Sequence, residues 1–156
     1  MDKLKTRAIV NLLKSLIIWL CFIPVAILNG GLREYVLVKV VGGKWALPIS
    51  GITLSVCIFL LTWFTLPHIT KACTSKDGWL MGICWCALTM AFEFVAGLTD
   101  GHTMKELVCA YNPLTGNLWL LVIATTFFSP VITGKFSPIY RLSDFGKATR
   151  RQGFRE

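Results

Sequence analysis

Charged side chains are scarce in this sequence, and their scarcity excludes an ordinary soluble domain. Charged residues make up 15% of the 156 residues and hydrophobic residues 54%, whereas soluble domains average about 25% charged residues. The chain therefore lacks the polar surface that would cover it in water. We expect it to lie in a membrane.

The motifs that mark an enzyme or a metal site are also missing. The sequence has no HExxH pair, no Gly-rich phosphate loop and no Ser, His and Asp in the order of a hydrolase. Its two histidines are His68 and His102, and His102 with Asp100 supplies too few ligands for a metal. Cys84 and Cys86 are two apart, so on a helix they point to different faces. We therefore predict no catalytic residue, no metal and no cofactor.

The excess of basic residues has a simpler explanation than nucleic acid. Lysine and arginine number 16 against 8 acidic residues, for a net charge of +8. These residues flank long apolar segments, and nothing resembles a nucleic-acid recognition module. Basic residues that border membrane spans stay on the cytoplasmic side, where they meet anionic headgroups. We expect membrane lipids as partners and no nucleic acid.

Apolar runs that are long enough to span a bilayer recur four times, because about 18 such residues suffice. They cover approximately residues 8–41, 48–66, 78–98 and 117–133. A short amphipathic segment, Thr103–Tyr111, lies between the last two, with Thr103 as N-cap and Glu106 three residues on. The sequence predicts an all-α polytopic membrane bundle of four transmembrane helices plus one short interfacial helix. Residues 1–133 would form the transmembrane domain and residues 134–156 a basic cytoplasmic tail.

The first run needs separate attention because it starts like a signal peptide. No small-x-small cleavage site occurs around Val25–Leu28, so we expect the helix to be retained. Pro24 and the Gly30-Gly31 pair are the positions at which it would kink. In the second run, Pro48 fits the first turn of a helix, where its missing N–H is not needed.

The distribution of basic residues predicts the orientation. With four spans the two ends share one side, which would carry 12 of the 16 basic residues if the tail is included. The remaining four, Arg33, Lys39, Lys44 and Lys105, fall on the other side. The excess of Lys and Arg on cytoplasmic loops then places both termini in the cytoplasm, and we expect the plasma (inner) membrane.

Three ionisable residues in or near the apolar runs are the candidate site, because charge inside a bilayer is costly. They are Arg33, Glu34 and Glu93, each toward the outer end of its helix. Asn29 shares a helical face with Arg33, and Thr89 shares one with Glu93.

The face that holds Thr89 and Glu93 also carries Gly82, Cys86 and Gly97. Small residues allow helices to approach closely in lipid. The simplest arrangement therefore packs this face on that of the first helix. An Arg33–Glu93 pair would be either a lock between helices or a polar site at the mouth of a cavity. Glu34 would pair with Lys39 or Lys105 or face water.

Several stretches resemble a group of small bacterial integral membrane proteins that have four helices and no assigned function. The stretches are Asn29 to Glu34, Ala87 to Phe94, Leu107 to Leu114 and Gly116 to Leu120, and the likeness extends over about residues 15 to 130. The resemblance implies the same span count and adds Tyr111, Asn112 and Gly116 to the residues of interest. The basic tail after Pro138 departs from the pattern of the group. The resemblance implies no activity.

Three classes of function are open. The chain could be a structural or accessory membrane component that binds a protein partner or forms a homo-oligomer. It could be a small oligomeric transporter or channel that uses the site of Arg33 and Glu93, although no internal repeat is visible. It could also be a membrane enzyme that acts on a lipid or a quinone, for which few acid and base residues are available. We favour the first.

Overall fold

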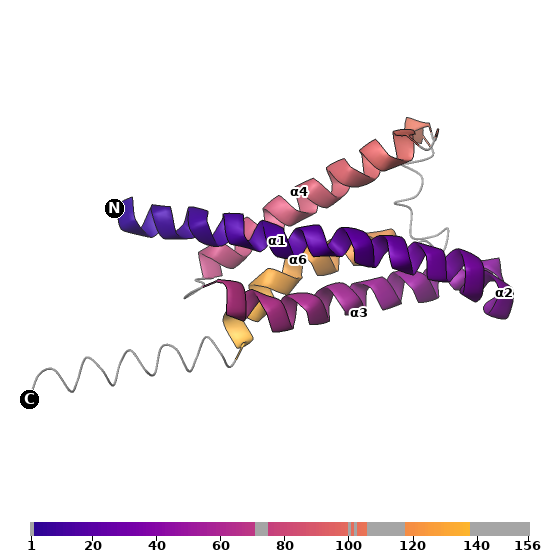
Figure 1. Cartoon of the computed structure of the whole chain (residues 1–156), viewed down its shortest axis with the longest axis horizontal. Helices are drawn as coiled ribbons and strands as arrows, with labels where there is room; N and C mark the ends of the chain where they lie inside the picture. Colours follow the sequence, from indigo (N-terminus) through magenta and orange to yellow (C-terminus); the bar gives the residue numbers. More distant parts are fainter. Residues whose placement is uncertain (1, 71–74, 100, 102, 106–117, 138–156) are drawn as a thin grey trace, which may run out of the picture.

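Four long α-helices make up most of what the computed structural model describes, which is residues 2–70, 75–99, 101, 103–105 and 118–137 (Figure 1). In chain order, α1 is Asp2–Leu32, α3 is Gly43–Ile69, α4 is Ser75–Thr99 and α6 is Trp119–Phe136. A π-helical turn, η1 (Arg33–Leu37), and a short helix, α2 (Val38–Val41), extend α1 without a break. The described residues contain no strand, and the predicted all-α bundle is confirmed.

Each of the four helices is long and apolar enough to cross a membrane. The candidate spans are Thr6–Val41, Gly43–Ile69, Lys76–Thr99 and Trp119–Phe136, with 36, 27, 24 and 18 residues. Large apolar side chains such as Leu28 and Phe64 point outward, 73% and 63% exposed, as the lipid-facing surface of a bundle requires. The chain is a multi-pass membrane protein. The predicted interfacial helix is Thr103–Tyr111, and its part from residue 106 onward lies outside the described residues.

The second span begins earlier than its apolar run. α3 starts at Gly43, five residues before Pro48, so the prediction that Pro48 lies in the first turn is wrong. The reason is Gly42, whose φ of 79° is open to glycine at no steric cost. Its carbonyl accepts the N–H groups of Trp45 and Ala46, at 3.2 and 3.0 Å. The chain therefore reverses immediately after α2 and starts a new helix there.

The first helix continues through Pro24 and the Gly30-Gly31 pair, and its irregularity comes directly after them. The five residues of η1 follow a π-helical path. A π-helical turn widens the helix and is frequent at functional sites. Arg33, which the sequence singles out by its charge, is the first residue of this turn.

Two glycines place α4 directly against α6. A Cβ on Gly82 would overlap the carbonyl oxygen of Phe127, and a Cβ on Gly78 would come within 3.1 Å of the carbonyl oxygen of Pro130. The two helices thus pack backbone to backbone, as small residues permit in membranes. Gly78 pairs with the later residue of α6, so α4 and α6 run antiparallel.

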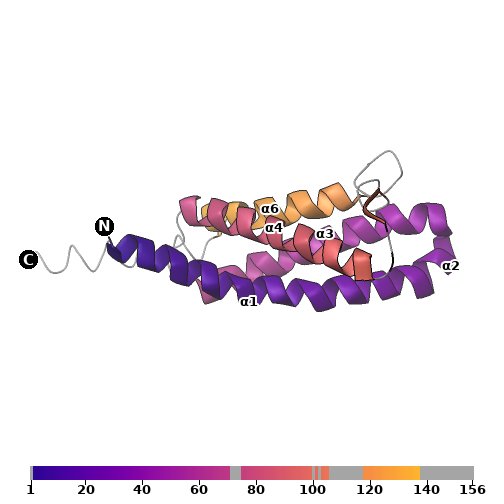
Figure 2. The same cartoon turned by 90° about the horizontal axis from the view of Figure 1, so that it is seen from above.

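α6 also packs along α3, here in parallel. Near one end Gly51 meets Leu118, 3.0 Å from where a glycine Cβ would stand. Eleven residues further along each helix, Ser129 donates a hydrogen bond to Thr62 at 3.3 Å. The two helices therefore keep a constant register. Figure 2 shows α6 on the side of the bundle opposite α1, with α3 and α4 between them.

α1 is joined to α4 by two indole hydrogen bonds. Trp85 of α4 is completely buried and donates its Nε1–H to Ser15 at 3.2 Å. Trp19 of α1 donates to Thr89 at 3.0 Å. Phe22 packs edge-on against Trp85, with ring centroids 5.2 Å apart. These contacts hold residues 15–22 of α1 against residues 85–89 of α4.

Candidate functional site

Arg33 is held at the start of η1 by its neighbour in the chain. Its Nε and Nη2 donate to Oε1 of Glu34 at 3.2 and 3.0 Å. The Arg33 side chain is 35% exposed and that of Glu34 is 61% exposed. Glu34 thus faces water, one of the alternatives expected for it, and its ion-pair partner is its neighbour Arg33, which was not among the expected partners. An exposed ion pair of this kind contributes only about 0–1 kcal/mol to stability.

Asn29 connects α1 to α3, one turn before Arg33. Its Nδ2 donates to the carbonyl oxygen of Ser50 at 3.2 Å and to the Ser50 hydroxyl at 2.7 Å. Its Oδ1 is buried and has no hydrogen-bond partner among the described residues. Buried polar atoms are almost always paired. The carboxamide therefore orients α1 on α3 and leaves one acceptor unused.

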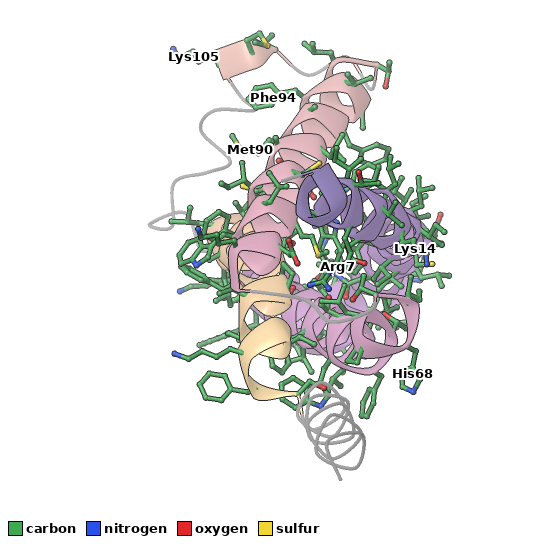
Figure 3. The ribbon with its side chains drawn as sticks, turned by 90° about the vertical axis from the view of Figure 1, so that its left-hand side faces the viewer. Arg7, Lys14, His68, Met90, Phe94 and Lys105 are labelled. Carbon is green, nitrogen blue, oxygen red and sulfur yellow. The ribbon has the colours of Figure 1, made fainter. Side chains whose placement is uncertain are left out.

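The polar faces of α1 and α4 meet at one level and separate beyond it. Thr89 contacts α1 through Trp19, whereas Gly82, which the sequence places on the same face, packs against α6 instead. In Figure 1 the C-terminal half of α4 diverges from α1 and α3. Figure 3 shows Met90 and Phe94 on the side of α4 that is turned away from α1.

A cavity of about 390 Å³ lies between the separated helices, and both Arg33 and Glu93 line it. We call it the bundle cavity. All four long helices contribute to its wall, with Phe22 from α1, Phe92 from α4 and Trp119 from α6 among the large apolar residues. Along α1 and into the first residue of η1 its lining runs from Trp19 to Arg33, which is about 21 Å at 1.5 Å per residue. The cavity is thus an elongated, mainly apolar slot with an acid and a base in its wall.

A second cavity of about 270 Å³ adjoins the first along the seam of α1 and α3. Asn29 and Ser50 line this one, and Arg33, Phe92 and Trp119 line both. Arg33 thus borders both spaces. Pockets of 300–1,000 Å³ are the usual size for small-molecule sites, and the two together fall in that range.

The structure thus brings together most of the residues that the sequence singles out. Arg33, Glu93 and Thr89 line the bundle cavity, and Asn29 lines the adjoining one. Tyr111 and Asn112 lie outside the described residues. No group of three or more His, Cys, Asp or Glu side chains suited to a metal occurs within the described part of the chain.

Two wall residues of the site were missed because their sequence signal is ambiguous. Trp119 reads from sequence as an interfacial anchor, since tryptophan is enriched at membrane surfaces. Trp19 stands in an apolar run, so its immediate surroundings give no signal and only its position on a helical face does. The four helices that pack around these two residues are separate in the sequence, so their meeting is seen only in the structure. A Trp that falls on the same helical face as polar residues is the signal that would have found Trp19, which is spaced seven residues from Ala26 and fourteen from Arg33.

Comparison with known proteins adds no relative: no protein-family model matches this chain, and neither a curated protein nor a solved structure is similar to it. The function is therefore argued from the site.

Proposed function

We propose that this membrane protein binds the hydrocarbon chain of a lipid-like amphiphile inside its helix bundle. The observation that carries the proposal is the bundle cavity of about 390 Å³ between α1 and α4. A methylene group is about as large as a water molecule, whose share of liquid volume is about 30 Å³, so the cavity holds on the order of thirteen such groups. The elongated form of the cavity suits a single hydrocarbon chain.

The access route supports an occupant that comes from the bilayer. α4 diverges from α1 (Figure 1), and residues of both helices line the cavity, so the slot lies between two lipid-facing helices. The wall is aromatic and aliphatic over most of its length, whereas the charged residues are few. An apolar chain enters such a space without the desolvation cost that a polar solute would meet. A bound lipid is also compatible with an accessory role beside a protein partner or a second copy.

The arrangement of the helix ends also supports an orientation in the membrane. The N-terminus of α1 and the end of α6 lie at one end of the bundle (Figure 1). Figure 3 views that end, with Arg7 near the middle of the helices and Lys14 at their edge. Among the described residues, this end carries six basic residues and the opposite end four, and from the sequence alone a four-span topology assigns 12 of the 16 to this side. We propose that it faces the cytoplasm of a bacterial inner membrane, so that Arg33 lies toward the outer surface.

The test is to fill the cavity and count bound lipid. Ala96 lines the bundle cavity, whereas Ala91 is exposed on the same helix and does not line it. The Ala96→Phe and Ala91→Phe variants therefore add the same volume at different places. Native mass spectrometry of protein extracted in mild detergent should show one retained lipid for the wild type and for Ala91→Phe, and none for Ala96→Phe. Equal retention by all three proteins would contradict the proposal.

A further inference from the structure

The second cavity, which Asn29 and Arg33 line, indicates which head group the bound chain carries. Among the described residues that line it, Arg33 is the ionisable one, and its charge is positive. Arg33 also borders the bundle cavity, at the end of that lining farthest along the helix from Trp19. We infer that the ligand is an anionic phospholipid with a hydroxyl in its head group, with the phosphate on Arg33, the hydroxyl on Asn29 and one chain in the bundle cavity. This inference rests on the proposed function.

Arg33 keeps one edge of its guanidinium open for a phosphate. A guanidinium has five N–H donors in a planar fork that matches a phosphate. Nε and Nη2, on one edge of the fork, both donate to the same oxygen of Glu34. The N–H groups of Nη1, on the other edge, donate to no atom of the described residues. A phosphate can therefore accept two parallel, charge-assisted bonds from Nη1 and Nη2, while Glu34 continues to orient the guanidinium.

Asn29 supplies the acceptor for the head-group hydroxyl. Its Nδ2 lies 3.2 Å from the carbonyl oxygen of Ser50, which can only accept, so the other carboxamide atom is Oδ1. That oxygen is buried and has no hydrogen-bond partner among the described residues, although buried polar atoms are almost always paired. Its partner must bring an N–H or an O–H. A hydroxyl does so without placing a second positive charge beside Arg33, whereas an ammonium group would be repelled there.

The spacing of Asn29 and Arg33 suits a single head group. They are four residues apart, which is about 6 Å along a helix, and they line the same cavity of about 270 Å³. At about 30 Å³ for a group the size of a water molecule, this space holds on the order of nine groups, as many as a phosphate with a three-carbon polyol needs. From the level of the bond between Trp19 and α4, Arg33 is about 21 Å along its helix and Glu93 only about 6 Å. Glu93, which has an interaction of its own, thus lies at the level of the chain and not of the phosphate.

The experiment compares four lipids that share the same chains and differ in head group. Delipidated wild-type protein is titrated with phosphatidylglycerol, phosphatidylethanol, phosphatidylcholine and diacylglycerol, and the bound lipid is counted by native mass spectrometry. Phosphatidylethanol keeps the charged phosphate but lacks the hydroxyls, so it should bind roughly fivefold more weakly than phosphatidylglycerol. Phosphatidylcholine and diacylglycerol should bind at least about tenfold more weakly. Free glycerol phosphate at millimolar concentration should not displace phosphatidylglycerol, because it lacks the chain.

Variants of the two head-group residues test the assignment of each. Arg33→Gln should lower the affinity for phosphatidylglycerol to that for diacylglycerol. The matched control is Lys39→Gln, which removes a positive charge from an exposed residue that lines neither cavity and should leave the affinity unchanged. Asn29→Ala should lower the affinity for phosphatidylglycerol to that for phosphatidylethanol and leave the latter as it was. Thermal unfolding in detergent identifies any variant that has lost its fold, and the comparison of lipids on the wild type then provides the test.

The outcomes separate this inference from the proposed function. If Ala96→Phe abolishes the binding of every lipid but the wild type binds phosphatidylcholine or phosphatidylethanol as tightly as phosphatidylglycerol, the inferred head group is refuted and the chain-binding cavity stands. If Lys39→Gln weakens binding as much as Arg33→Gln, the attraction is not specific to the cavity and the inference is refuted. If free glycerol phosphate competes, the site recognises the head group without a lipid and the inference is likewise refuted. If no lipid binds or Ala96→Phe has no effect, the proposed function itself fails.

Discussion

The close contact of α4 and α6 makes the substitution of Gly82 by alanine the sharpest test of the packing. A Cβ at this position would overlap the carbonyl oxygen of Phe127. That oxygen belongs to the backbone of α6, which cannot rotate away as a side chain can. The two helices would have to move apart, and Gly78 shows that they are also close one turn away.

The expected cost follows from what overpacking does in other interiors. Inserting a methyl group into a packed interface typically costs about 1–3 kcal/mol. A chain of this size loses about 2–4 °C in melting temperature per kcal/mol, so Gly82→Ala should melt roughly 2 to 12 °C below the wild type. Intrinsic tryptophan fluorescence of the protein in detergent reports the transition, since Trp85 is buried in the bundle.

Gly30 provides the matched control for this experiment. It also lies inside a helix, but a Cβ added there meets nothing within 4 Å. Since alanine is the better helix former by roughly 0.5–1 kcal/mol, Gly30→Ala should melt at or slightly above the wild-type temperature. If Gly82→Ala and Gly30→Ala melt alike, then α4 and α6 do not approach each other as described and the reasoning is refuted.

Three further substitutions and one control probe the polar contacts, each with melting temperature as the measurement. Trp85→Phe removes the hydrogen bond to Ser15 and keeps the aromatic contact, so it should cost about 1 kcal/mol; a much larger loss would mean that packing dominates. Thr133 is completely buried and its Oγ1 has no partner within the described part of the chain, so Thr133→Val should be neutral or stabilising by about 1 kcal/mol. The same change at Thr126, whose hydroxyl donates to the backbone, should gain nothing. Asn29→Ala removes two hydrogen bonds to α3 together with one unpaired acceptor, and these opposing effects should leave a loss of about 1 kcal/mol or less; a loss above about 3 kcal/mol would show that the carboxamide is a main support of the bundle.

The span count is readable from this sequence because the bilayer imposes a length on every helix. Runs of apolar residues long enough to cross it are local features, and their number does not depend on tertiary contacts. The exact ends are less accessible. α3 starts at Gly43 and not at Pro48 because the positive φ of Gly42 permits the reversal, and a conformation of that kind leaves no mark on hydropathy.

The partners of the polar residues could be predicted only in part, because several arrangements satisfy the same pattern. The face that contains Gly82, Thr89 and Glu93 is contiguous on a helical projection, yet the structure uses Gly82 against α6 and Thr89 against α1. Helices that cross at an angle divide a single face between two neighbours. The cavity arises from that division, and it is therefore invisible in the sequence of either helix.

Unequal helix length has a consequence for the membrane around the protein. α6 has 18 residues and the first span has 36, which correspond to about 27 and 54 Å at 1.5 Å per residue. The hydrocarbon layer is about 30 Å thick, so the long span must tilt or project, whereas α6 barely reaches across. The bilayer is expected to thin beside α6 and not beside α1, because lipids adjust to a short helix at a modest cost per ångström. Lipids with longer acyl chains would therefore strain the bundle first on the side of α6. A change in bilayer thickness thus acts unequally on the two sides of the protein.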